Sequence, residues 1–139
     1  MKKFNHEVLV VGGGWAGVSA ALAAKAAGAD VAVCERTDML LGAGLVGGIM
    51  RNNGRHTAAL EATAMGFGDL FLLTDRLSRH TNIAFPGHSH ASLYDVLKIE
   101  PEVGRLLQDR GIPVYFGKRI SRLRARDKIV ARVLSDDDD

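Results

Sequence analysis

The sequence predicts an α/β fold, a Rossmann-like doubly wound parallel sheet with helices on both faces and a small antiparallel β hairpin near the C-terminus. Three observations predict it. Residues 8–11, 31–34 and 112–116 are short, mostly apolar runs, as expected of parallel strands buried on both faces. A segment rich in Ala and Leu at 19–27 separates the first two runs, and a longer amphipathic segment precedes the third. Strands that alternate with helices in this order are typical of a parallel sheet.

A glycine motif joins the first strand to its helix, and it reads Gly12-x-Gly14-x-x-Gly17. Gly12 permits a tight turn, Gly14 lets the backbone approach a pyrophosphate, and Gly17 lets the helix pack close to the sheet. The free amides and the dipole at the helix N-terminus stabilise phosphate charge. Gly28 ends the helix as a C-cap glycine does. The pattern predicts a dinucleotide site.

An acidic residue closes the second strand. Glu35 follows Gly17 by 18 residues, close to the spacing of roughly 20 at which an acid binds the ribose hydroxyls of a dinucleotide. A carboxylate bonds a free 2′-hydroxyl and repels a 2′-phosphate, which disfavours NADP, and the neighbouring Arg36 weakens this preference only in part. The alternative interpretation is a βαβ unit that binds nothing.

Local signals divide the chain after the second strand. Residues 57–65 and 69–79 both allow helix, and Asn52-Asn53-Gly54 is a turn signal. Residues 82–89, which include Pro86-Gly87, are predicted to form a loop.

A further helix is predicted before the third strand. Ser92 or Asp95 can cap it, and its apolar positions keep helical spacing until Gly111. Pro101 falls inside this pattern, so the helix either kinks there or a second helix begins with Pro101 at its first position.

The last segment is predicted to be a hairpin, with arms at 119–126 and 129–134 that turn at Asp127-Lys128. Its basic residues are Lys118, Arg119, Arg122, Arg124, Arg126, Lys128 and Arg132. Aromatic residues do not interleave with them, so a solvated face is favoured over a nucleic-acid surface. Residues 136–139 are predicted to be a solubilising acidic tail.

Composition describes an ordinary globular protein. Apolar residues make up 47% and charged residues 24%, and the net charge is only +2, so neither nucleic acid nor membrane is an expected partner. The single Cys34 excludes an intrachain disulfide and suits a cytoplasmic location. His88-x-His90 has the spacing of two metal ligands, but no firm third or fourth ligand accompanies it, so no metal is expected.

The motif and its surroundings resemble the FAD-binding N-terminus of the glutathione reductase and fumarate reductase flavoprotein superfamily. Residues 39–48 resemble the glycine-rich loop that these FAD-dependent oxidoreductases place after the ribose-binding Glu. The resemblance implies that FAD is the cofactor and that the backbone near Ile120 touches the adenine. The residues expected to bind the cofactor are Gly12, Gly13, Gly14, Trp15, Ala16, Gly17, Glu35, Arg36, Gly42, Ala43, Gly44 and Ile120.

The resemblance covers residues 1–139 as an incomplete FAD/NAD(P)-binding domain in which 117–135 is a β-hairpin insertion. Relatives continue with a further parallel strand and a substrate domain, so the chain is expected not to be catalytic alone and no catalytic residue is identified. The loop carries Ala43 where relatives often have Ser or Thr, which leaves the flavin-ring contact unassigned.

Three interpretations of function stay open. The leading one is the FAD-binding portion of a flavin-dependent oxidoreductase. The second is an NAD(P)-binding module of another oxidoreductase, and the third is a non-catalytic subunit that pairs with a separate C-terminal half. An exposed edge at residues 8–11 is expected to bind that half or a second copy of the chain. Trp15 is expected either to pack over the nucleotide or to cover the helix start.

Overall fold

The computed structural model describes residues 4–45, 51–52, 59–86, 88–126 and 129–135 of the 139-residue chain. Its centre is a parallel sheet in the order β1-β2-β6, formed by β1 (Val8–Val11), β2 (Val31–Cys34) and β6 (Val114–Tyr115). The register pairs Val8 with Val31 and Val33 with Val114. The three predicted parallel strands are confirmed, and the third lies beside the second.

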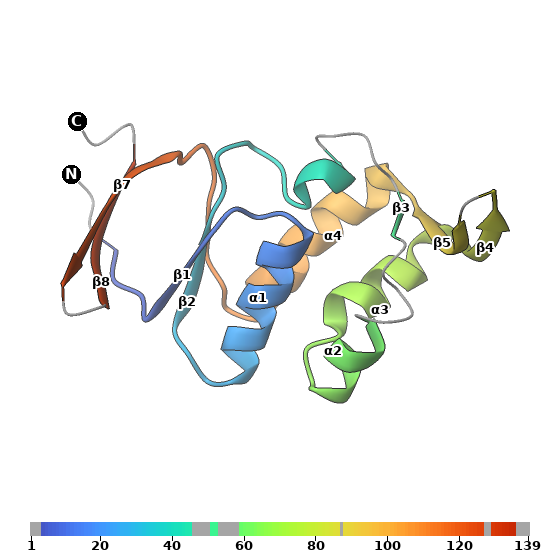
Figure 1. The fold of residues 1–139 in the computed structure, drawn as a ribbon, viewed down its shortest axis with the longest axis horizontal. Helices are drawn as coiled ribbons and strands as arrows, with labels where there is room; N and C mark the ends of the chain where they lie inside the picture. Colours follow the sequence, from blue (N-terminus) through green and yellow to red (C-terminus); the bar gives the residue numbers. More distant parts are fainter. Residues whose placement is uncertain (1–3, 46–50, 53–58, 87, 127–128, 136–139) are drawn as a thin grey trace.

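Helices α1 (Trp15–Ala26) and α4 (Val96–Asp109) cover one face of this sheet (Figure 1). Strand side chains alternate between faces, and Val31 and Val33 of β2 point into the core that the helices close. All four residues of β2 are buried, as its uncharged sequence predicts. The buried core consists of Val18, Ala21, Leu22, Val31, Val33, Leu40, Leu41, Leu70, Leu73, Tyr94, Ile99, Val103, Leu107 and Ile112.

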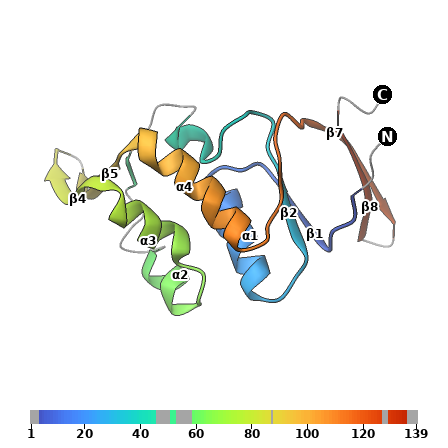
Figure 2. The same ribbon diagram turned by 180° about the vertical axis from the view of Figure 1, so that it is seen from behind.

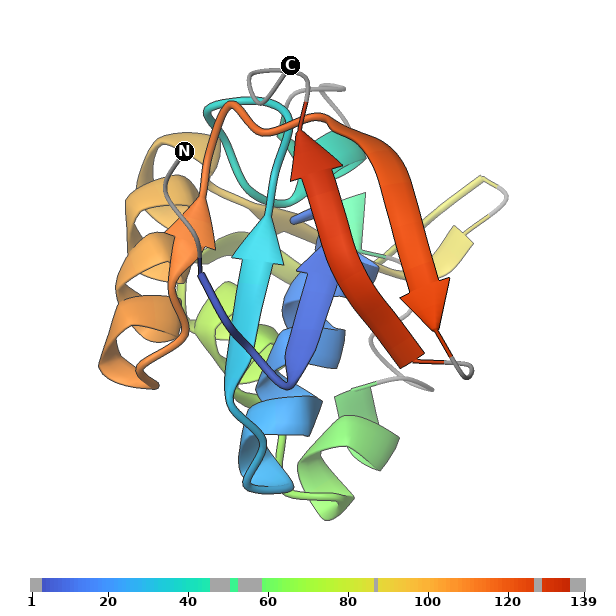
Figure 3. The same ribbon diagram turned by 90° about the vertical axis from the view of Figure 1, so that its left-hand side faces the viewer.

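The hairpin of β7 (Ile120–Arg126) and β8 (Ile129–Ser135) lies on the opposite side of the sheet (Figures 2 and 3). The fold class, the parallel sheet and this hairpin are confirmed. The described helices lie on the α1 side, however, and not on both faces as expected. Successive strands are added on the same side of the sheet, from β1 to β2 to β6. Right-handed crossovers between strands added in one direction place their helices on the same face.

The prediction of a loop at residues 82–89 is wrong. β4 (Ser78–Phe85) and β5 (His88–Tyr94) pair antiparallel, and β3 (Arg51–Asn52) pairs with β5, in the order β3-β5-β4. Pro86 follows the first arm, so it marks a tight hairpin turn. The register shifts along the β4–β5 pair, and bulges of this kind hide the two-residue period of a strand.

Two short helices precede this hairpin. α2 (Leu60–Ala64) and α3 (Asp69–Arg76) confirm the helices predicted within 57–65 and 69–79. The second ends earlier than expected because β4 begins at Ser78. Of the predicted turn at 52–54, Asn52 belongs to β3, and the other two residues lie outside the described part.

One continuous helix passes through Pro101. Asp95 caps α4 by accepting a hydrogen bond from the Leu97 amide at 3.1 Å, which selects Asp95 over Ser92. Proline removes the bond to the carbonyl four residues earlier, which is that of Leu97. Leu97 is 82% exposed, so this carbonyl lies on the solvent side, where water can replace the lost donor.

Candidate functional site

The turn after β1 carries the chain directly into α1. Gly12 has a φ of +103°, which disfavours any side chain, and its amide donates to the Cys34 carbonyl at 2.8 Å. A Cβ on Gly17 would overlap the carbonyl oxygen of Gly12. Both residues therefore must be glycine for reasons within the fold, namely a tight turn and the close approach of helix and strand.

Neither of these reasons requires glycine at position 14. Its φ of −68° and ψ of −178° are ordinary extended backbone, and a Cβ there would meet nothing within 4 Å. Gly14 is the N-cap of α1, and no side chain caps the helix. The amides at a helix N-terminus lack intrahelical acceptors and attract anions. The open space over Gly14 therefore fits a phosphate group.

Glu35 follows β2, and its carboxylate turns back to the glycine turn. Only 6% of the residue is exposed. Its Oε2 accepts a hydrogen bond from the Gly13 amide at 2.7 Å, and its Oε1 accepts from the Thr37 amide at 2.8 Å and the Thr37 hydroxyl at 2.9 Å. A carboxylate has about four acceptor positions, so Oε2 can accept one more donor, such as a ribose hydroxyl.

The carboxylate of Glu35 is held in its charged form. Burial acts to raise its pKa, but the hydrogen bonds from the Thr37 and Gly13 amides and the Thr37 hydroxyl, together with the nearby Arg36 amide, outweigh burial, and the pKa is lowered. The Arg36 side chain is exposed, so this residue acts on the carboxylate through its backbone. Glu35 is thus an acceptor, not a donor, at neutral pH.

A second glycine segment lies against the first. Gly42–Gly44 form the short 3₁₀ turn η1. The Leu41 amide donates to the Gly13 carbonyl at 2.7 Å, and a Cβ on Gly42 would lie 3.4 Å from the Cα of Gly14. The two segments, distant in sequence, therefore form one surface at the start of α1.

No sequence pattern singled out Tyr94, which ends β5 and is 1% exposed. Its hydroxyl donates to the Gly44 carbonyl at 2.9 Å and accepts from Nε1 of Trp15 at 3.4 Å. The Trp15 ring also packs near Phe71, with centroids 5.7 Å apart. The indole is thus turned toward α3 and β5. A buried tyrosine hydroxyl predicts some partner, but it does not identify which one.

The remaining predicted residues lie around this surface. Ala16 and Ala43 are exposed, in the first turn of α1 and in η1. Ile120 begins β7, and the preceding chain runs beside Glu35, where the Lys118 amide donates to the Glu35 carbonyl at 3.0 Å.

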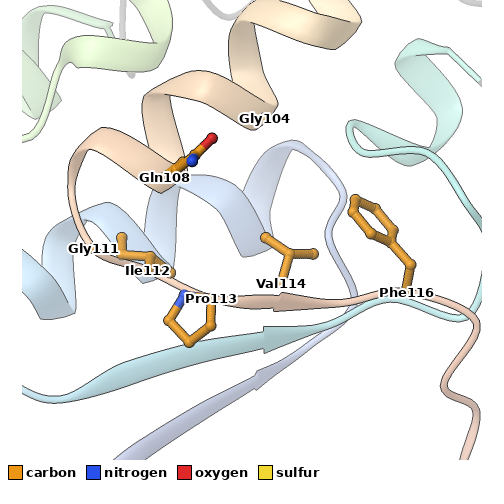
Figure 4. Close-up of a pocket in the computed structure, with 7 residues that line it drawn as sticks. All are labelled: Gly104, Gln108, Gly111, Ile112, Pro113, Val114 and Phe116. Atoms are coloured by element: carbon orange, nitrogen blue, oxygen red, sulfur yellow. The ribbon is translucent and has the colours of Figure 1, made fainter.

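A hollow of about 400 Å³ lies between α4 and β6 (Figure 4), and none of its lining residues belongs to either glycine segment. Gly104, Gln108, Gly111, Ile112, Pro113, Val114 and Phe116 line it. Its lining side chains are apolar except for Gln108, which leaves no charged partner for a phosphate. The glycine segments, with their free helix N-terminus, suit a phosphate better than this hollow does.

The described residues hold neither a cluster of metal ligands nor a membrane-spanning helix. Among the described side chains, no three His, Cys, Asp or Glu residues gather where they could hold a metal ion. The side chains of His88 and His90 are outside that part. Within the part of the chain that the structure describes, no helix is both long and apolar enough to cross a membrane.

The fold and the two glycine segments define a dinucleotide-binding domain. The chain belongs to the FAD-dependent oxidoreductase family, whose sequence model matches residues 7–138. FAD is therefore the cofactor, and the space over Gly14 and the acceptor Glu35 fit its pyrophosphate and ribose.

Solved structures share this fold. GidA from Aquifex aeolicus has a TM-score of 0.70 at 16% identity, over 95% of this chain and 23% of that protein. The Diels-Alderase PyrE3 of pyrroindomycin biosynthesis has a TM-score of 0.67 at 19% identity, over 95% of this chain and 29% of the other. A Klebsiella pneumoniae HpxO variant complexed with FAD has a TM-score of 0.58 at 20% identity, over 97% of this chain and 37% of that protein. The chain spans less than half the length of each, and no curated protein matches it in sequence.

Proposed function

We propose that this chain is the FAD-binding portion of a flavin-dependent oxidoreductase of the glutathione reductase and fumarate reductase superfamily. It holds the ADP part of FAD over the turn from Gly12 to Gly17. The observation that carries the proposal is Gly14, whose lack of a side chain has no cause in its backbone angles or in protein packing. A ligand that must approach the backbone there supplies the cause.

Each residue of the surface has a part in binding. The amides that start α1 donate to the pyrophosphate, and Oε2 of Glu35 accepts from a ribose hydroxyl while it holds the Gly13 amide. The Gly42–Gly44 segment runs toward the flavin, and the backbone at Ile120 lies toward the adenine. When bound, the flavin supplies electron and hydride transfer, and the protein supplies position and electrostatics.

Further protein completes the enzyme in this proposal. Among the described strands β1 pairs only with β2, and Val11 is 58% exposed. Such an edge favours pairing with another strand, so we assign it to a complementary C-terminal segment or to a second copy of the chain. A reducing cytoplasm suits the single free cysteine.

The test is a titration of FAD against Gly14→Val, with Gly104→Val as the matched control. A Cβ meets nothing within 4 Å at either position, so both variants should fold. We expect Gly14→Val to bind FAD at least about tenfold more weakly than the wild type, because the side chain occupies the pyrophosphate position. Gly104→Val should bind like the wild type. Equal affinity in the two variants would contradict the proposal.

A further inference from the structure

The second glycine segment has a backbone shape that its own sequence disfavours. Leu41, just before it, has a φ of +67°, and its side chain is 1% exposed. A bulky residue in the left-handed region is strained, and such a conformation persists only where surrounding contacts hold it. The contacts on either side of this residue therefore decide the shape of Gly42–Gly44.

Two hydrogen bonds hold the segment, one at each end. At the near end, the Leu41 amide donates to the Gly13 carbonyl at 2.7 Å. At the far end, the Tyr94 hydroxyl donates to the Gly44 carbonyl at 2.9 Å. A Cβ on Gly44 would overlap the Tyr94 hydroxyl and lie 2.6 Å from Nε1 of Trp15. Gly44 is thus glycine because these two side chains approach its backbone.

The hydroxyl of Tyr94 is itself oriented. The Trp15 indole N–H can only donate, and it points at this hydroxyl, so the hydroxyl proton turns toward Gly44. Burial raises the pKa of Tyr94, although the bond from Trp15 opposes the rise, and the hydroxyl stays a neutral donor. The next residue, Asp95, caps α4 and pairs with Arg79 at 3.2 Å, which fixes the backbone behind the ring.

We propose that Tyr94 is a positioning residue for the cofactor: its hydroxyl, oriented by Trp15, holds Gly42–Gly44 against Gly14 so that FAD meets a preformed surface. The inference rests on the proposed function. Without the hydroxyl, Leu41 relaxes from its strained conformation and Gly42–Gly44 moves. The free energy of FAD binding then includes the cost of ordering this segment again.

The experiment compares Tyr94→Phe with Tyr115→Phe. Tyr115 is the other tyrosine of the chain, and its hydroxyl lies 2.9 Å from Nε2 of His6, before β1. Each variant loses one hydroxyl and keeps its ring. We expect Tyr94→Phe to weaken FAD binding about five- to tenfold, because the bond that holds Gly44 is lost, and Tyr115→Phe to stay within about twofold of the wild type.

A second measurement needs no cofactor. The amides of Gly44 and Leu45 donate to Leu41 and Gly42 at 2.9 and 3.0 Å, so hydrogen exchange at these two amides reports the shape of the segment. Tyr94→Phe should speed their exchange about fivefold, and Tyr115→Phe should not change it. The emission of Trp15, the only tryptophan, should also change in Tyr94→Phe alone.

The outcomes separate the two proposals. If the wild type binds no FAD, the proposed function fails. If the wild type binds FAD and Tyr94→Phe binds equally well, or if both tyrosine variants lose the same affinity, the positioning role fails and the proposed function stands. Should Tyr94→Phe not fold, Trp15→Phe removes the orienting N–H together with part of the indole ring. It should weaken binding about two- to threefold, and wild-type affinity in that variant would overturn the inference.

Discussion

Replacing Glu35 with Gln tests how much its carboxylate stabilises the contact between the end of β2 and the glycine turn after β1. The carboxylate accepts from three donors, one on the Gly13 side and two on Thr37. An amide keeps one oxygen and presents an NH₂ group in place of the other. Whichever way the amide turns, its NH₂ group faces at least one N–H donor, and it cannot accept a hydrogen bond from that donor.

The magnitude follows from the more favourable orientation. If the amide oxygen keeps the two bonds to Thr37, the Gly13 amide is left without its acceptor in a buried position. An unsatisfied buried donor costs about 1–3 kcal/mol. For a domain of this size, that loss lowers the melting temperature by roughly 3–10 °C.

The assay is a thermal melt without FAD at pH 7, followed by circular dichroism, with Glu7→Gln as control. Glu7 accepts from the Asp30 amide at 2.8 Å through Oε2 in an exposed position, and an amide oxygen can keep that bond. Glu7→Gln should therefore change stability by less than about 0.5 kcal/mol. If the two variants melted at the same temperature, the reasoning about Glu35 would be refuted.

Other predictions concern the same surface. Because the pKa of Glu35 is lowered from 4.5, its contribution to stability is present above that value and is lost as the pH falls through the folded value; melts from pH 7 to pH 3 should show the wild-type advantage over Glu35→Gln shrinking below pH 4.5. Gly17→Ala should lose about 2–3 kcal/mol of stability in urea unfolding, because its Cβ overlaps a backbone oxygen. Calorimetry should give tighter binding for FAD and ADP than for NADP, since Glu35 repels a 2′-phosphate, and the reverse order would overturn that assignment. Light scattering should detect concentration-dependent association through β1, and Val11→Lys should reduce it.

The parts of the fold that the sequence predicts are those in which neighbouring residues determine the geometry. β1, α1 and β2 follow from uncharged runs around Gly12 and Gly17, where backbone angle and close packing allow only glycine. The β4–β5 hairpin does not follow, because its register shifts remove the alternation and Pro86 looks like a loop signal. The single helical layer depends on strand order, which no local pattern contains.

The site shows the same difference between features set by neighbouring residues and features set by distant contacts. Gly14 and Glu35 were identifiable by spacing alone. Thr37, which donates twice to Glu35, and Tyr94, which meets Gly44 from a distant strand, were not. Their roles depend on contacts between segments far apart in sequence, and a tyrosine or threonine in isolation has no pattern that identifies its partner.

The most direct test of the account is an ADP titration of the wild-type chain followed by the NMR shifts of its backbone amides. Binding over the glycine turn predicts the largest changes at Gly13, Gly14 and Glu35, because the pyrophosphate and ribose lie against these groups. Gly104 and Gly111, which line the hollow between α4 and β6, should not change. Largest changes at that hollow, with a silent glycine turn, would contradict the account.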